Sequence, residues 1–404
     1  MPAGARAEIS VGDEVEVDCG SVAGGGAVIA HHGGRTLLIR HALPGERVVA
    51  RVTEVRAKIV RADAVQVIRP SPARVVPPCP AARPGGCGGC DLQHVRLDDQ
   101  RAWKAEVVRD ALRRTGVWDG PVQVEALAPE ETGLHWRTRM RWTVSADGRP
   151  GLRRHRSHDV EVIDDCLIAS PGIADWLGTA PRFPDAVEVR TTEGGAGVSV
   201  EVEGVHTAGP TRVIEVVGDR RWRLAPESFW QVHPGAPAML TACVMQMAQA
   251  GPGEEWWDLY AGAGLFSAPL ALAVGPGGRV ESVEASASAV RDARRALHDL
   301  PQVRLHEAAV ERWAPPPGRR PDGVVLDPPR AGAARAVVDL VLDARPGRVV
   351  YVSCDPMTLA RDLALLTAGG YRLDEVRAFD TFPMTHHVET VGALTRVGAA
   401  DQIS

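Results

Sequence analysis

The chain has 404 residues, a net charge of −5, and 45% hydrophobic and 24% charged residues. This is the composition of an ordinary globular protein with two or three domains, and the acidic balance excludes a uniformly basic nucleic-acid-binding protein. No apolar run reaches membrane-spanning length and the first residues lack a signal-peptide pattern, so we expect a cytoplasmic protein without a membrane partner. The odd number of cysteines, seven, favours metal ligation or catalysis over a disulfide framework.

Positive charge is concentrated in two segments. Residues 31–74 contain nine Arg or Lys residues against three acids, and residues 135–158 contain seven arginines against one acid. Local patches of this kind are typical of phosphate-binding surfaces. A general preference for arginine is the alternative explanation, since the chain has only two lysines, Lys58 and Lys104.

Residues 1–72 are predicted to form a small β-barrel. Short β-branched segments such as 36–39 and 47–52 alternate with glycine and proline turns, a pattern of closely spaced strands. With the basic excess, this indicates an oligonucleotide-binding type of barrel that contacts RNA; a protein-binding barrel is the alternative. The segments Leu43-Pro44-Gly45-Glu46 and Ser71-Pro72-Ala73-Arg74 resemble the TRAM domain of RNA-modifying enzymes.

Residues 73–225 are predicted to form a central β-rich domain that begins with a cysteine segment. Cys79, Cys87 and Cys90 lie on a glycine- and proline-rich loop, and Cys166 is the best candidate for a fourth ligand. Ligation by thiolates alone selects zinc or an iron–sulfur cluster, and the spacing does not decide between them.

The same domain contains an expected amphipathic helix over 97–115, followed by an alternating segment at 135–142. On a strand, Arg137, Arg139 and Arg141 would project from one face, suited to RNA phosphates, with Trp136 and Trp142 on the other. A solvated sheet face is the alternative.

Residues 226–404 are predicted to form an α/β domain, because strand–helix alternation from Glu254 onward indicates a parallel, Rossmann-like sheet. The first strand, which ends at Tyr260, runs into Ala261-Gly262-Ala263-Gly264, where glycines let a ligand approach the backbone. Glu284 ends the next strand and can bind ribose hydroxyls. The loop lacks the third glycine of the dinucleotide pattern, so S-adenosylmethionine fits better than a nicotinamide cofactor.

Polar groups also follow the later strands. Strand 323–326 leads into Asp327-Pro328-Pro329-Arg330, and strand 348–352 leads into Ser353-Cys354-Asp355-Pro356. Cys354, at a strand end, is a candidate nucleophile, and the alternative is a buried core cysteine. Glu389 stands among apolar and neutral residues and is a candidate general base, and the alternative is a surface carboxylate.

Together these segments resemble the RNA uracil-5-methyltransferase family, and the match extends through Phe229-Trp230-Gln231 and the cysteine segment. The resemblance implies a class I S-adenosylmethionine-dependent methyltransferase with Cys354 as nucleophile and Glu389 as base. It further implies a cofactor and uracil pocket built from Gln231, Tyr260, Gly262, Gly264, Glu284 and Asp327. A four-iron–four-sulfur (4Fe-4S) cluster would be held by Cys79, Cys87, Cys90 and Cys166. Departures from the family pattern are Ala261, Asp355 and a long first cysteine gap.

Addition of a thiolate at C6 turns uracil into an enolate whose C5 can accept a methyl group, which is why this chemistry needs Cys354. The combination of a TRAM barrel and a cluster resembles the ribosomal-RNA enzymes, so we expect 23S ribosomal RNA as substrate and a monomeric protein. The alternatives are the same reaction on transfer RNA, RNA cytosine-5-methylation, and an RNA-binding iron–sulfur protein without activity. The cytosine enzymes carry a Cys beside the first proline of the fourth-strand segment, where this chain has Pro329.

Overall fold

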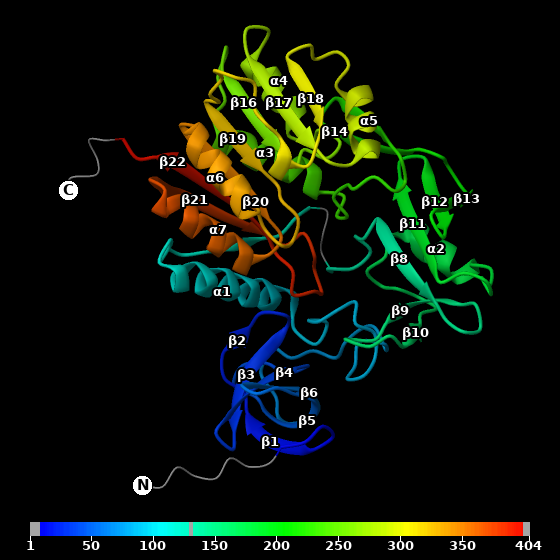
Figure 1. Ribbon diagram of the computed structural model, residues 1–404. Coiled ribbons are helices and arrows are strands. Elements are labelled where there is room, and N and C mark those ends of the chain that lie inside the picture. Colours follow the sequence, from blue (N-terminus) through cyan, green and yellow to red (C-terminus); the bar gives the residue numbers. More distant parts are fainter. Residues whose placement is uncertain (1–8, 129–131, 399–404) are drawn as a thin grey trace.

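The computed structural model describes residues 9–128 and 132–398. Figure 1 shows three parts: an N-terminal β-domain, a central β-rich part and a C-terminal α/β domain. This is the multi-domain architecture that the sequence predicted. Within the described ranges, no helix is long and apolar enough to cross a membrane.

The N-terminal part is a six-stranded sheet that curls back on itself. Its strand order is β1-β5-β6-β4-β3-β2, and β1 also contacts β3. In β1, Val15 and Val17 face the core while Glu14 and Glu16 are exposed, which is the alternation of a half-buried strand. The strands are β1 Glu14–Asp18, β2 Val22–Ala23, β3 Ala27–His32, β4 Arg35–Arg40, β5 Arg47–Val55 and β6 Ile59–Arg69.

The central part is a second six-stranded sheet, with the order β10-β9-β8-β11-β12-β13, and a separate β14-β15 hairpin. Helix α2, Pro171–Thr179, packs on β11 and β12. The strands are β8 Arg139–Val144, β9 Pro150–Arg153, β10 Val160–Val162, β11 Glu188–Gly194, β12 Gly197–Val202, β13 Val205–Ala208, β14 Val213–Val217 and β15 Arg220–Leu224.

The C-terminal part is built on an eight-stranded sheet of order β18-β17-β16-β19-β20-β22-β21-β7. Its inner strands are buried on both faces, as expected of a parallel sheet covered by helices. The strands are β7 Val124–Glu125, β16 Glu255–Leu259, β17 Arg279–Glu284, β18 Val303–Glu307, β19 Gly323–Leu326, β20 Arg348–Ser353, β21 Tyr371–Phe379 and β22 Glu389–Arg396. The helices are α3 Ala236–Ala248, α4 Ser267–Val274, α5 Ala287–Ala296, α6 Arg335–Ala344 and α7 Pro356–Ala368, with the 3-10 helix η1 Val310–Arg312.

The predicted helix over 97–115 is present as α1, Leu97–Thr115, and ends at Gly116 in the left-handed conformation. It packs against α7, and β7 adds to the edge of the catalytic sheet beside β21. The β14-β15 hairpin likewise packs on α5. Elements from the predicted central domain, namely α1, β7 and the β14-β15 hairpin, therefore also pack on the C-terminal domain, and the domain limits at residues 72 and 225 stay predictions.

Helix α1 also belongs to two hydrophobic cores. Trp103 packs into the core of the N-terminal barrel, whereas Val108, Ala111 and Leu112 pack into the core beneath α7. Between these two groups of residues, the fully buried Lys104 donates to Asp380 at 2.5 Å and to the carbonyl of Phe382 at 3.0 Å. One helix thus fixes the barrel, the catalytic domain and the β21–β22 loop (residues 380–388) relative to one another.

Lys104→Met should lower the free energy of unfolding by about 3–5 kcal/mol, because it leaves the buried Asp380 carboxylate without its charged partner. Urea unfolding followed by tryptophan fluorescence measures this loss. The double variant Lys104→Met/Asp380→Leu should lose less than the single variant, since an apolar pair leaves no buried charge. Equal stability of wild type and Lys104→Met would contradict this description of the anchor.

Candidate active site

Four parallel strands, β16, β17, β19 and β20, end at one edge of the catalytic sheet. This is the edge at which open α/β sheets present groups to ligands. Tyr260, Glu284, Asp327 and Cys354 stand at or directly after these strand ends. Strand β22 runs antiparallel to β20 and therefore begins at the same edge, with Glu389.

Cys354 and Glu389 are neighbours across the β20–β22 pair. Ser353 pairs with Thr390, so one further step brings Cys354 level with Glu389. Glu389 is buried, with 3% of its surface exposed, and Cys354 is half-buried. The structure thus brings together the two residues that the sequence singled out as nucleophile and base.

The turn that presents Cys354 is fixed by its neighbours. Asp355 caps helix α7, and its Oδ1 accepts from the amides of Met357 and Thr358 at 3.0 and 2.9 Å. The Asp355 amide in turn donates to the Ser353 hydroxyl at 3.2 Å. Asp355, a departure from the family pattern, is thus the residue that caps α7 in this chain.

The charges around Cys354 oppose its ionisation. Burial, together with the nearby carboxylates of Glu389 and Asp327, raises the pKa of the thiol to about 11, although the Arg330 guanidinium opposes the rise. The sequence motif contained Arg330 but gave it no role. The sequence signal that could have identified Arg330 is its place at the end of the polar segment that follows β19.

The carboxyl groups at this edge also have raised pKa values. Burial raises the pKa of Glu389 well above its ordinary value, Asp327 adds to the rise and Arg330 opposes it. Burial raises the pKa of Asp327 to about 7, and the nearby Asp258 adds to it. Such clustering of perturbed groups is typical of functional sites. Sequence reasoning missed Asp258, which is fully buried in β16 and accepts from Ser267 Oγ at 2.5 Å.

The glycine-rich turn after β16 has a left-handed backbone at three positions. Tyr260, Gly262 and Gly264 all have positive φ, at 66°, 55° and 84°. A Cβ on Gly264 would lie 2.6 Å from Leu297 Cδ1, so this position needs glycine. Both oxygens of Glu284 accept backbone N–H groups, from Gly262 at 2.9 Å and Ser286 at 2.6 Å, which orients the carboxylate beside the turn.

Gln231 lies in a different segment, the loop between β15 and α3. It is buried, with 8% of its surface exposed, and its neighbour Trp230 packs in the same core as Ala263 and Phe266 of the glycine turn. The six predicted pocket residues therefore come from the loop before α3 and from the ends of β16, β17 and β19.

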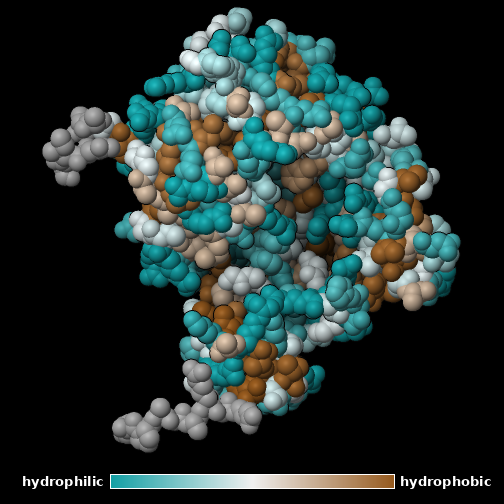
Figure 2. Space-filling view, in the orientation of Figure 1, coloured by the Kyte–Doolittle hydropathy of each residue, from teal (hydrophilic) through white to brown (hydrophobic). Residues whose placement is uncertain are grey.

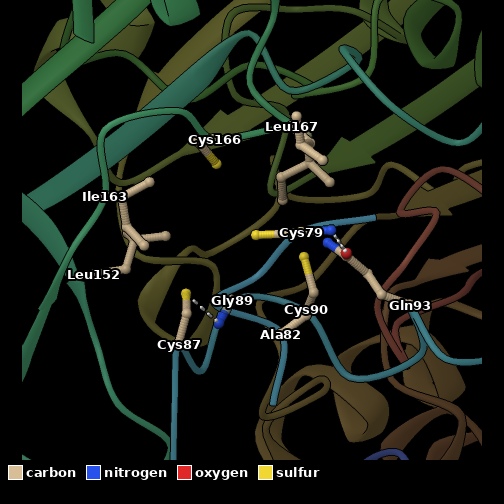
Figure 3. A pocket seen from close by; sticks show the side chains of 11 residues that line it. Cys79, Ala82, Cys87, Gly89, Cys90, Gln93, Leu152, Ile163, Cys166 and Leu167 are labelled. Carbon is tan, nitrogen blue, oxygen red and sulfur yellow. Dashed lines mark hydrogen bonds between the residues drawn. The ribbon is translucent and has the colours of Figure 1, made fainter. Parts of the chain in front are cut away.

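The four predicted cysteine ligands surround one cavity, into which their sulfur atoms point (Figure 3). Cys79, Cys87 and Cys90 come from the loop before α1, and Cys166 comes from the central domain. Burial raises the pKa of the Cys87 thiol to about 11 and also raises that of Cys166. Across the described residues, no group of His, Cys, Asp and Glu side chains is close enough to hold a single metal ion. The thiols enclose a space and do not converge on one point.

The predicted row of exposed arginines is only partly present. Strand β8 begins at Arg139, whose side chain is 12% exposed and pairs with Glu215 at 3.0 Å. Arg137 precedes the strand and is largely buried; burial lowers its pKa, while the thiols of Cys166 and Cys90 oppose this. Arg141 alone is exposed, and it pairs with Glu188. Arg139 is not exposed because Glu215 of the β14-β15 hairpin covers it, and RNA binding by the three arginines stays a prediction.

The two tryptophans flanking that row are buried and do not form a surface for stacking bases. Trp142 donates from Nε1 to Thr191 Oγ1 at 3.0 Å, and Trp136 stacks on His233 at 6.0 Å between ring centroids.

Comparison with known proteins identifies the family. The tRNA (Uracil-5-)-methyltransferase family model matches residues 319–397, which include Asp327, Cys354 and Glu389, and the TRAM domain model matches residues 9–65. An uncharacterized RNA methyltransferase of Streptomyces coelicolor is 43% identical over 95% of this chain and 93% of its own length. One from Corynebacterium efficiens is 36% identical over 97% of both chains. The chain belongs to the RNA (uracil-5-)-methyltransferase family.

The fold of this RNA methyltransferase is shared with a solved structure. The tRNA (uracil-54, C5)-methyltransferase of Pyrococcus abyssi, in complex with S-adenosyl-L-homocysteine, matches 94% of this chain and 100% of its own with a TM-score of 0.71 at 23% identity. The predicted fold class, a methyltransferase domain preceded by a TRAM barrel and a β-rich part, is confirmed.

The electrostatics of the methyltransferase site predict how Cys354 reacts. Alkylation of Cys354 by iodoacetamide should accelerate roughly tenfold per pH unit between about pH 7 and 9, because only the thiolate reacts and the thiol pKa lies above this range. Arg330→Gln should slow alkylation at each pH, since Arg330 lowers that pKa. Mass spectrometry of the peptide that contains Cys354 separates it from the other six cysteines.

Arg335→Gln is the matched control, because Arg335 forms an exposed pair with Asp339 on α6. An alkylation rate that is insensitive to pH, or equal in Arg330→Gln and Arg335→Gln, would contradict the charges assigned to this site.

Proposed function

We propose that this protein methylates C5 of a uridine in RNA, with S-adenosylmethionine as methyl donor and with a covalent bond between Cys354 and C6 of the uracil. The observation that carries the proposal is the pairing of β20 with β22. It sets Cys354 level with the buried Glu389 at the ligand-binding edge of the sheet.

Cys354 would begin the reaction. C5 of uracil is too poor a nucleophile to take a methyl group directly, so the Cys354 thiolate adds at C6 and places the electron pair of the C5–C6 bond on C5. S-adenosylmethionine supplies the methyl group, which is bonded to its positively charged sulfonium sulfur. The Arg330 guanidinium favours the thiolate, since it is the positive charge that lowers the pKa of Cys354.

Glu389 would complete the reaction. After C5 has been methylated it still carries its proton, which a base must remove so that the bond to Cys354 can break and restore the double bond. Burial and Asp327 raise the pKa of Glu389 well above its ordinary value. An ionised Glu389 at this place therefore binds a proton strongly, which suits it to accept the one on C5.

The residues at the carboxyl edge fit the methyl donor. The turn leaves open space at Gly262, where a Cβ would have no atom within 4 Å, and the carboxylate of Glu284 stands beside it, where it would bind ribose hydroxyls. Tyr260, Asp327 and Gln231 lie around the same edge and would complete the pocket between donor and uracil.

The RNA substrate is proposed to be 23S ribosomal RNA, supported by the presence of both a TRAM barrel and a four-cysteine site in one chain. Transfer RNA is the second candidate, favoured by the family description and by the Pyrococcus abyssi structure. The face where the domains meet is hollowed, as Figure 2 shows, and offers a place for RNA beside the catalytic edge. Incubation with labelled donor and either purified RNA distinguishes the two substrates.

Glu389→Gln should trap the covalent intermediate, because the amide keeps the shape of the side chain but does not accept the C5 proton. With substrate RNA and S-adenosylmethionine, a denaturing gel should show a slowly migrating protein–RNA band. The band should be absent in Cys354→Ala/Glu389→Gln, and Cys354→Ala alone should have no turnover. Wild-type turnover by Glu389→Gln without a trapped band would show that Glu389 is not the base. His386 and His387 would then be the candidates to test.

The four cysteines are proposed to hold a 4Fe-4S cluster. A single zinc ion would require the four sulfur atoms to meet at one point, at about 2.3 Å from the metal. The sulfur atoms instead surround a cavity whose other walls are mainly apolar, including Leu152 and Ile163 (Figure 3). Such a cluster would tie the cysteine segment to Cys166 of the central domain.

Cys87→Ser should lose iron and soluble yield together, because the proposed cluster ties the cysteine segment to Cys166 of the central domain. Iron and sulfide analysis of anaerobically purified protein measures the loss. Cys243→Ser is the control, since Cys243 is buried in α3 and lies outside the cysteine cavity. Stoichiometric zinc in colourless wild-type protein would overturn the cluster.

A further inference from the structure

Asp91, the residue after Cys90, lies where the three parts of the molecule meet. Its side chain is 7% exposed. Oδ1 accepts from Arg40 of the barrel at 3.1 Å, and Oδ2 accepts from His386 Nδ1 at 2.5 Å and from the His386 amide at 3.3 Å. One carboxylate therefore joins the barrel, the cysteine segment and the β21–β22 loop.

The backbone around Asp91 makes the same connection. The amides of Asp91 and Leu92 both donate to the carbonyl of Met384 at 3.0 Å. Met384 has a positive φ of 65°, and its own amide donates to Gln100 Oε1 of α1 at 2.9 Å. A non-glycine residue in this conformation persists only where its surroundings hold it.

The barrel approaches Asp91 as closely as glycine allows. A Cβ on Gly26 would lie 2.5 Å from the Cβ of Asp91, and Gly26 also has a φ of +68°. The position of Asp91 is thus limited on the barrel side by Gly26 and Arg40, and on the catalytic side by His386.

The β21–β22 loop that Asp91 holds leads directly into the proposed base. His386 stands three residues before Glu389, and its ring lies against that of His387 with 4.1 Å between centroids. Lys104 fixes the start of this loop through Asp380 and Phe382. Asp91 and Gln100 contact its later part, which enters the active site.

We propose that Asp91 is a positioning residue for methyl transfer: through His386 it fixes the end of the β21–β22 loop and so the place of Glu389 relative to Cys354. This proposal rests on the proposed function of Glu389. Cys90 and Asp91 are adjacent in the cysteine segment. A change in the conformation of that segment would therefore also change the position of Glu389.

Asp91→Ala tests the contact directly through hydrogen–deuterium exchange. Amides of the peptide covering 384–388 should exchange faster in the variant, because His386 loses its acceptor, while the peptide covering 356–368 in α7 should be unchanged. This readout does not depend on activity, so it separates the positioning role from the proposed reaction. Unchanged exchange in 384–388 would overturn the proposal.

Kinetics with the RNA substrate give the second readout. Asp91→Ala should reduce kcat roughly tenfold to a hundredfold, the range expected for a small misplacement of a catalytic group. The KM for S-adenosylmethionine should stay within about twofold, because Tyr260, Gly262 and Glu284 are untouched. His386→Ala should have the same effect. The double variant Asp91→Ala/His386→Ala should be no slower than either single variant, since each substitution removes the same contact between Asp91 and His386.

Two further variants separate positioning from stability. Gly26→Ala displaces Asp91 from the barrel side without a change of charge and should reproduce the fall in kcat, whereas the exposed Asp339→Asn on α6 should leave kcat and exchange unchanged. Iron content per protein should stay at the wild-type value in Asp91→Ala. Loss of iron in proportion to the loss of kcat, or additive effects of Asp91→Ala and His386→Ala, would overturn the proposal and leave Asp91 a purely structural residue.

Discussion

The antiparallel pairing of β22 with β20 is the constraint on which the site depends. Strands β16, β17, β19 and β20 run parallel to one another and contribute the residues that follow them to the ligand-binding edge, whereas β22 runs antiparallel to both β20 and β21. A reversed strand contributes its first residue to that edge, and here the residue is Glu389. A slip of one residue would turn Glu389 to the opposite face, because side chains alternate along a strand. Hydrogen bonds from both β20 and β21 make such a slip costly.

Desolvation dominates the chemistry that this constraint creates. The edge gathers a thiol and several carboxyl groups in a poorly solvated space, and burial is the largest cause of the raised pKa of each. Arg330 opposes the rise at both Cys354 and Glu389. Burial thus favours the neutral forms of these groups, whereas the guanidinium of Arg330 favours the ionised forms that the proposed reaction requires.

Local patterns in the sequence predicted the local features well. The helix at 97–115, the strand at 323–326 and the place of Cys354 directly after a strand all follow from periodicity and turn residues, and the structure contains each of them. The exposure of Arg137 and Arg139 did not follow, because alternation along a strand says nothing about what covers each face. Glu215, the partner of Arg139, lies 76 residues away on a separate hairpin. The contact of Asp91 with His386 spans 295 residues and has no local signal at all.

The sharing of α1 between two cores has a consequence for biosynthesis. The barrel strands end at Arg69, but the barrel core also contains Leu92, Val95 and Trp103. A ribosome that has released only the strands has therefore produced a barrel with part of its interior open to water. The barrel reaches its final packing only when α1 has emerged, and α1 in turn buries its other residues against α7, near the C-terminus. The second apolar face of α1 thus stays uncovered until α7 has been synthesised, and chaperones have an exposed apolar surface to protect during that interval.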